Sequence, residues 1–68
     1  MRVTVEVVGD RTHEVEAADG DTYADLLRAV ELNPHRVAVH VDGRPVPEDQ
    51  PVETEHVRVL RLVKGGSP

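Results

Sequence analysis

The stretch HVRVLRLV, residues 56–63, decides the fold, because its valines alternate with polar residues and leucines follow them. An alternation of period two is the pattern of a strand with one buried face. The stretch MRVTVEVV, residues 1–8, has the same pattern, with three valines on one face and Arg2, Thr4 and Glu6 on the other. These are the two most strongly patterned segments of the chain. We predict that they lie side by side and parallel at the centre of a sheet.

Further segments lie between these two strands. The sequence predicts a second strand over residues 12–17, a helix that begins after Thr22 and ends at Asn33-Pro34, a strand over residues 36–41, a short edge strand over residues 44–46 and a loop over residues 47–51 with one tight helical turn. The helix has a capping box, formed by Thr22 and Asp25, and one apolar face. One amphipathic helix and alternating strands bury their apolar sides only against each other. The predicted fold is therefore α+β, a β-grasp with a mixed four- to five-stranded sheet and one helix packed on one face.

Length and composition exclude several classes of function. A chain of 68 residues makes one domain, which we place at residues 1–63, with a flexible tail at residues 64–68. The net charge of -5 argues against direct nucleic-acid binding. No run is long and apolar enough to cross a bilayer, so we expect a cytoplasmic monomer without membrane contact. The acidic, lysine-poor surface is typical of adaptation to high salt, although biased codon usage gives the same excess of Arg over Lys.

Catalysis and metal binding by the domain itself are not expected. There is no cysteine, and the four histidines lack the close helical spacing of a metal site. The acidic pair Glu48-Asp49 lies in a polar loop with nothing apolar to raise a pKa. We therefore predict a protein that is not an enzyme and that holds no cofactor of its own.

The combination of these elements resembles a known family. The hairpin of valines, the capped helix TYADLLRAVEL, the segment NPHRVAVHVDGRPVPEDQ and the terminal VRVLRLVKGG are together similar to the small archaeal modifier proteins, ubiquitin-like proteins of archaea, and most of all to the haloarchaeal ones. The resemblance covers residues 1–66. It is far more specific than a Gly-Gly pair alone.

The resemblance implies a function for the C-terminal glycines. In the family, a ubiquitin-activating-type enzyme uses ATP to adenylate the terminal glycine, which is then joined to lysines of target proteins or converted to a thiocarboxylate that donates sulfur to tRNA or molybdopterin. Gly66 would be the reactive residue and Gly65 would give access, because glycines let enzyme walls approach the backbone closely. Ser67 and Pro68 depart from the family pattern. If these two residues are native, a zinc-dependent desampylase-like protease would have to cut between Gly66 and Ser67.

Two further sites are inferred. Lys64 is the sole lysine, and so the only side chain able to accept an isopeptide bond from another copy. Strand alternation puts Ala38, His40, Arg58 and Leu60 on the sheet face away from the helix. The resemblance implies that this face is a docking patch for partners. The alternative is a solvated face with one stray leucine.

Three functions remain open at the level of the sequence. The chain is a conjugated modifier, a sulfur carrier, or a non-covalent interaction domain. In the last case the GGSP end is an incidental tail or a remnant of expression cloning. The first two share every feature described, because both begin with the same adenylate.

Overall fold

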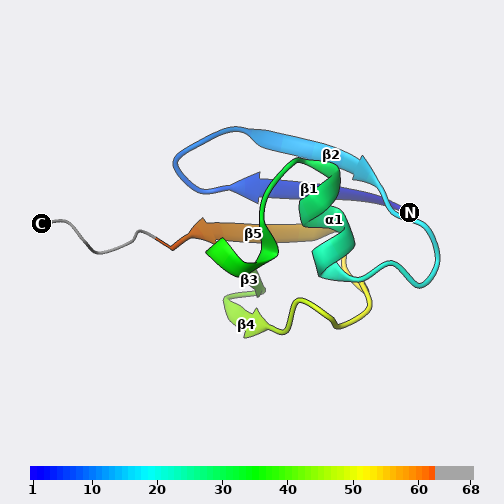
Figure 1. Ribbon diagram of the computed structural model, residues 1–68. Coiled ribbons are helices and arrows are strands. Elements are labelled where there is room, and N and C mark those ends of the chain that lie inside the picture. The colour runs from blue at the N-terminus through cyan, green and yellow to red at the C-terminus, as the bar shows by residue number, and fades with distance from the viewer. Residues whose placement is uncertain (63–68) are drawn as a thin grey trace, which may run out of the picture.

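The computed structural model describes residues 1–62, and Figure 1 shows a sheet crossed on one face by a single helix. The elements are β1 (Arg2–Val7), β2 (Thr12–Glu16), α1 (Tyr23–Ala29), the 3₁₀ turn η1 (Pro34–Arg36), β3 (Val37–Val41), β4 (Arg44–Val46) and β5 (His56–Arg61). Within these residues no helix is long and apolar enough to cross a bilayer.

The sheet has five strands in the order β2-β1-β5-β3-β4. The central pair, β1 and β5, is parallel, with Val5 opposite Val57, while the other three pairs are antiparallel. The first and last strands therefore lie side by side at the centre, as their alternation predicted. This confirms the β-grasp arrangement.

The core forms where the valine faces of the central strands meet α1. Val3, Val5, Val57 and Val59 are at most 2% exposed, and Leu26 and Leu27 of the helix pack against them in one cluster. Burying one such side chain contributes about 2 kcal/mol. Tyr23 is also buried, and its hydroxyl accepts a long bond from the Glu53 N–H at 3.5 Å.

The helix begins at the predicted capping box. The Asp25 N–H donates to the Thr22 hydroxyl at 3.3 Å, and the Thr22 N–H donates to the Asp25 carboxylate at 2.9 Å. The bond from the Thr22 backbone lowers the pKa of Asp25, because it stabilises the ionised carboxylate.

The end of the helix is a correction to the prediction. α1 ends at Ala29, before the expected Asn33-Pro34, because Glu31 adopts a left-handed conformation with φ of 63°. The Leu32 N–H donates to the Leu27 carbonyl at 2.8 Å, and the Glu31 N–H donates to the Arg28 carbonyl at 3.0 Å. This pair of bonds is a Schellman motif. It is built here without the usual glycine.

Smaller corrections concern turns and strand ends. Arg36 belongs to η1 and not to β3, because the Asn33 side chain accepts from the His35 N–H at 2.9 Å and opens a 3₁₀ turn at Pro34. Residues 47–51 form no helix. They have a single turn, in which the Gln50 N–H donates to the Pro47 carbonyl at 3.2 Å, and Pro51 forms an isolated β-bridge with Thr22. β5 ends at Arg61, one residue before the limit of the described chain.

Candidate functional site

The last two described residues, Arg61 and Leu62, are held at one end of the sheet. The Leu62 N–H donates to the Arg36 carbonyl at 3.0 Å. The Arg61 guanidinium donates to Asp10, in the β1–β2 turn, at 2.7 Å. The last described residues are thus fixed to segments on both sides of β5. Lys64, Gly65, Gly66 and Ser67, the residues of the predicted conjugation and processing sites, lie outside the described residues.

The four residues of the predicted docking patch lie on the sheet face opposite α1. Ala38 is paired with Leu60, and His40 with Arg58, across β3 and β5. Their neighbours Val37, Val39, Val57 and Val59 are buried on the other face. We call these four residues, Ala38, His40, Arg58 and Leu60, the β3–β5 patch. Leu60 is half-buried and Arg58 is exposed.

A shallow hollow adjoins this patch. It has a volume of about 280 Å³ and is lined by Glu6, His40, Asp42, Gly43, His56 and Arg58. Glu6 lies within 3.2 Å of the His56 ring nitrogen and 3.7 Å of the Arg58 guanidinium. The Nδ1 atom of His40 is shielded from solvent and has no hydrogen-bond partner among the described residues. The hollow therefore has a polar, charged lining next to the apolar Leu60.

The comparisons with known proteins agree with this architecture. The sequence model of the family small archaeal modifier protein 2 matches residues 1–63. Small archaeal modifier protein 2 of Haloferax volcanii is 68% identical over 66 residues, which cover 97% of this chain and 100% of the relative. The chain belongs to this family. An uncharacterized protein of Archaeoglobus fulgidus is 36% identical over 67 residues, covering 97% of this chain and 100% of its own length.

A solved structure extends the comparison from sequence to fold. The crystal structure of the Haloferax small archaeal modifier protein 2 is similar with a TM-score of 0.74 at 67% identity, covering 94% of this chain and 97% of that one. The ubiquitin-like β-grasp fold and the resemblance drawn from the sequence are thereby confirmed. Members of such a family are modifiers or carriers and not catalysts.

Two exposed apolar residues were missed by the sequence interpretation, and one of them lies beside the β3–β5 patch. Val8 follows β1, is 39% exposed, and donates its N–H to the Val59 carbonyl at 2.9 Å, which sets it beside Leu60. Leu62 is 56% exposed at the end of the described chain. The consecutive pair Val7-Val8 was the available signal, because successive strand residues point to opposite faces.

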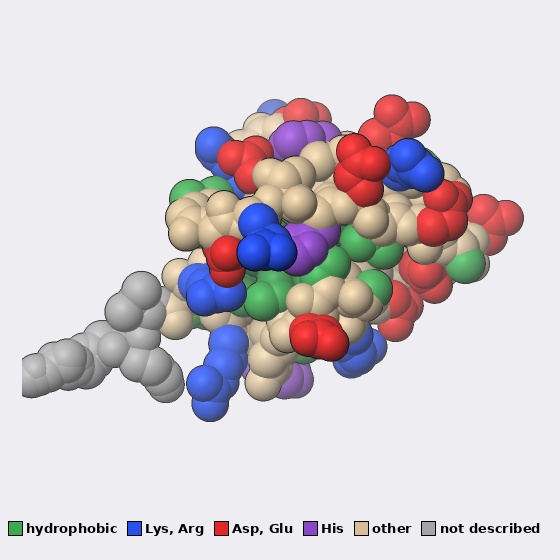
Figure 2. Space-filling view, turned by 90° about the horizontal axis from the view of Figure 1, so that it is seen from above, with side chains coloured by type: hydrophobic (Ala, Val, Ile, Leu, Met, Phe, Trp, Pro, Cys, Tyr) green, Lys and Arg blue, Asp and Glu red, His purple; other side chains and the backbone are tan. Residues whose placement is uncertain are grey.

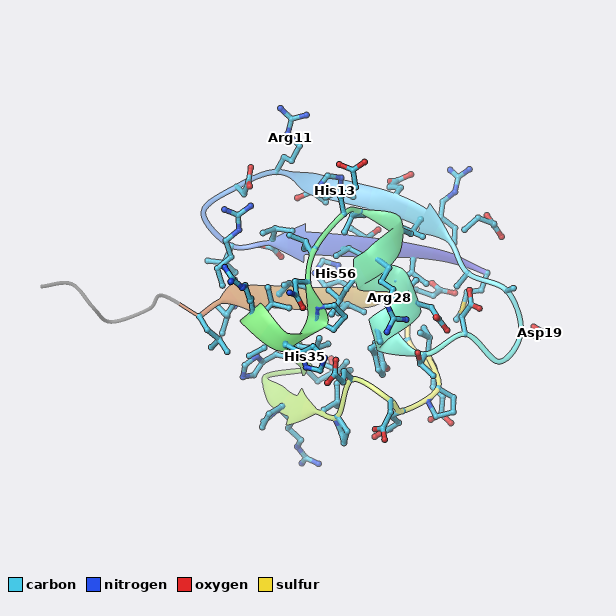
Figure 3. All side chains as sticks on the ribbon, in the orientation of Figure 1. Arg11, His13, Asp19, Arg28, His35 and His56 are labelled. Atoms are coloured by element: carbon cyan, nitrogen blue, oxygen red, sulfur yellow. The ribbon has the colours of Figure 1, made fainter. Side chains whose placement is uncertain are left out.

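Histidines and acids do not converge on a metal site in the part of the chain that the structure covers. Within residues 1–62 no group of three or more His, Asp or Glu side chains is arranged to hold a metal ion. Figure 3 shows His13, His35 and His56 on three separate elements. Two of them lie near a single carboxylate each, His35 near Glu48 at 3.6 Å and His56 near Glu6 at 3.2 Å.

Proposed function

We propose that this small archaeal modifier protein is activated at the Gly66 carboxylate and joined to lysines of target proteins, and that it also carries sulfur for tRNA thiolation. The observation that carries the proposal is membership of the family over residues 1–63, followed after Lys64 by Gly65-Gly66. A tail leaving a central strand that is fixed on both sides can enter an enzyme channel without disturbing the core.

The chemistry begins with one step for both outcomes. An oxygen of the Gly66 carboxylate attacks the α-phosphorus of ATP, the bond to the β-phosphate breaks, and pyrophosphate leaves. A lysine amine that attacks the resulting acyl-adenylate expels AMP and forms an isopeptide bond. Hydrosulfide that attacks it through sulfur expels AMP and gives the thiocarboxylate, with no change of oxidation state. ATP is thus consumed on the activating enzyme and is not a bound cofactor of this chain.

Processing is proposed to precede activation in the 68-residue chain. The carboxylate of Pro68 lies two residues beyond Gly66, so we propose that a zinc-dependent desampylase-like protease first cuts the Gly66–Ser67 bond. This is supported by the alignment with the Haloferax relative, which spans 66 residues and the whole of that protein. The length equals that of residues 1–66 of this chain.

The β3–β5 patch is proposed as the surface that partners recognise after conjugation. A half-buried leucine rimmed by a histidine and an arginine suits the centre of a small interface. The protein is proposed to act as a cytoplasmic monomer in this role. If the tail were incidental, the same patch would serve a non-covalent interaction domain.

Deleting Gly65 and Gly66 in the native host tests the function as a whole. We expect complete loss of the conjugate ladder and of thiolated tRNA, because neither product forms without the adenylate. Immunoblots of an epitope-tagged protein and mass spectrometry of tRNA nucleosides measure the two outcomes. Retention of both in the deletion strain would support the non-covalent alternative. Loss of tRNA thiolation, with no adducts of the intact protein ever detected, would support a dedicated sulfur carrier.

Self-conjugation is expected to be rare. Lys64 is the sole lysine and stands two residues before the reactive glycine, where a neighbouring isopeptide bond crowds the tail. Apart from the Met1 amine, no other amine can accept the carboxyl group. We expect single additions to targets to dominate, and Lys64→Arg to leave the ladder nearly unchanged. Abundant long polymers linked through Lys64, seen in tryptic peptides by mass spectrometry, would contradict this.

A further inference from the structure

One edge of the sheet is open to pairing. β2 is an outer strand, and among residues 1–62 no strand pairs with its outer side. The Ala17 N–H donates to the Met1 carbonyl at 2.7 Å, and the Val7 N–H donates to the Arg11 carbonyl at 3.3 Å. Bonded pairs alternate along an antiparallel ladder, so the residues between them, Thr12, Glu14 and Glu16, direct their backbone N–H and C=O groups away from β1.

The opposite edge of the sheet is protected. β4 has only three residues, Arg44–Val46. Its central residue is Pro45, which has no N–H to donate. Short strands and prolines are common means of blocking the edge of a sheet. β2 carries neither device, so it is the edge at which a further strand can be added.

A groove runs beside this open edge. It has a volume of about 530 Å³ and lies between β2 and the C-terminal end of α1, lined by His13, Glu14, Val15, Glu16, Ala29, Val30 and Glu31. Val15 and Val30 are half-buried and supply apolar surface. Figure 3 shows His13 between β2 and the segment that follows the helix. A side chain projecting from an added strand on the α1 side of the sheet would enter this groove.

The charge of the edge indicates which segment would pair with it. Glu14 and Glu16 have side chains 60% and 72% exposed. Glu14 contacts Arg2 at 3.4 Å, and Glu16 contacts the Met1 amine at 2.9 Å. Both contacts are surface ion pairs, which contribute little free energy. Figure 2, which looks onto the β2 side, shows acidic side chains gathered toward the end where Met1 lies. A second copy of β2 would set glutamates against glutamates, so self-pairing is disfavoured.

We propose that β2 binds an extended peptide segment as a sixth strand, with apolar side chains in the groove at alternate positions and Lys or Arg side chains beside Glu14 and Glu16 between them. Main-chain hydrogen bonds to an edge strand give affinity, and pockets for alternate side chains give specificity. This site is separate from the β3–β5 patch. Peptide binding at β2 does not require the tail, so this proposal can be tested independently of conjugation.

The test uses the full 68-residue chain and a synthetic nonapeptide of alternating valine and arginine with blocked ends. In ¹⁵N NMR titrations at low salt we expect shifts centred on β2 and the end of α1. Slower amide exchange is expected at Thr12, Glu14 and Glu16. The control peptide has the same sequence but is N-methylated at the alternate amides that would face β2. We expect it to bind at least about tenfold more weakly, because it cannot form the ladder.

Two variants at one position separate charge from backbone pairing. Glu14→Gln should weaken binding about two- to fourfold, the effect of a single exposed charge, and the difference from wild type should vanish in molar salt. Glu14→Pro removes an outward N–H, which β1 does not use, and should weaken binding at least about tenfold. If Glu14→Pro fails to fold, the N-methylated peptide still measures how much the main-chain hydrogen bonds contribute to binding. Equal binding of both peptides, shifts centred on Leu60, or no binding at millimolar peptide would overturn the proposal.

Discussion

The chain ending at Gly66 is expected to support ATP–pyrophosphate exchange with its activating enzyme, whereas the 68-residue chain is expected to support none above background. Two extra residues move the carboxylate by up to about 7 Å. Misplacement of a reacting group by only 1 Å can cost about a hundredfold in rate. Exchange of labelled pyrophosphate into ATP measures the adenylation step directly, without the later transfer to lysine or sulfur.

A shortened chain provides the matched control. Protein ending at Gly65 has a terminal glycine carboxylate but a tail one residue too short, and it should be as inactive as the 68-residue chain. Both forms keep all of residues 1–62, so their far-ultraviolet circular dichroism should be unchanged. Equal exchange by the forms ending at Gly66 and Pro68 would remove the need for processing, and the proposed protease with it.

The fold could be predicted from the sequence where the spacing of apolar residues matches the two-residue repeat of a strand. The alternating valines of residues 1–8 and 56–63 specify which face of each central strand is buried, because a shift of one residue would expose all of them. The structure buries Val3, Val5, Val57 and Val59 as that alternation requires. The same alternation correctly predicted that the four residues of the β3–β5 patch share a face. That partners bind this patch stays a prediction.

The end of the helix could not be predicted, because it depends on a backbone conformation that the sequence does not signal. Val30 continues the apolar face, and Asn33-Pro34 supplies a plausible stop. The chain instead turns at Glu31, a residue type that rarely adopts positive φ. Packing of Leu32 against the core cluster accompanies this turn. A tertiary contact of that kind is not visible in local spacing.

The β2 edge was missed for a different reason. A strand was correctly predicted here, one residue longer than the observed Thr12–Glu16, but whether a strand is internal or at an edge depends on the order of all five strands. The groove also needs the helix to end beside β2, and that end was the feature predicted wrongly. Neighbouring residues in space, such as Val15 and Val30, therefore had no common signal in the sequence.

Aspartate at Val59 is expected to unfold the domain, whereas aspartate at the next residue, Leu60, is expected to leave it folded. Val59 is 0% exposed, between β1 and β3 on the α1 face. Replacing it forfeits about 2 kcal/mol of apolar burial and adds about 2 to 7 kcal/mol for a buried carboxyl group without a partner. The core of a domain of this size rarely supplies more than about 3 to 5 kcal/mol of stability. Thermal unfolding followed by circular dichroism should show no cooperative transition for Val59→Asp.

Leu60→Asp tests the β3–β5 patch on the same strand. Leu60 is only half-buried, on the face away from α1 and opposite Ala38, so a carboxylate there remains in contact with water. We expect a cooperative transition lowered by a few degrees, in line with about 1 kcal/mol for a partly exposed site. Enzymes and receptors that dock on the patch should bind at least about tenfold more weakly, because the charge lies where an apolar anchor is needed. If Leu60→Asp also abolishes cooperative unfolding, Leu60 is part of the core and the patch loses its apolar centre. If it unfolds normally and binds the activating enzyme and conjugate receptors as wild type does, recognition lies elsewhere on the domain.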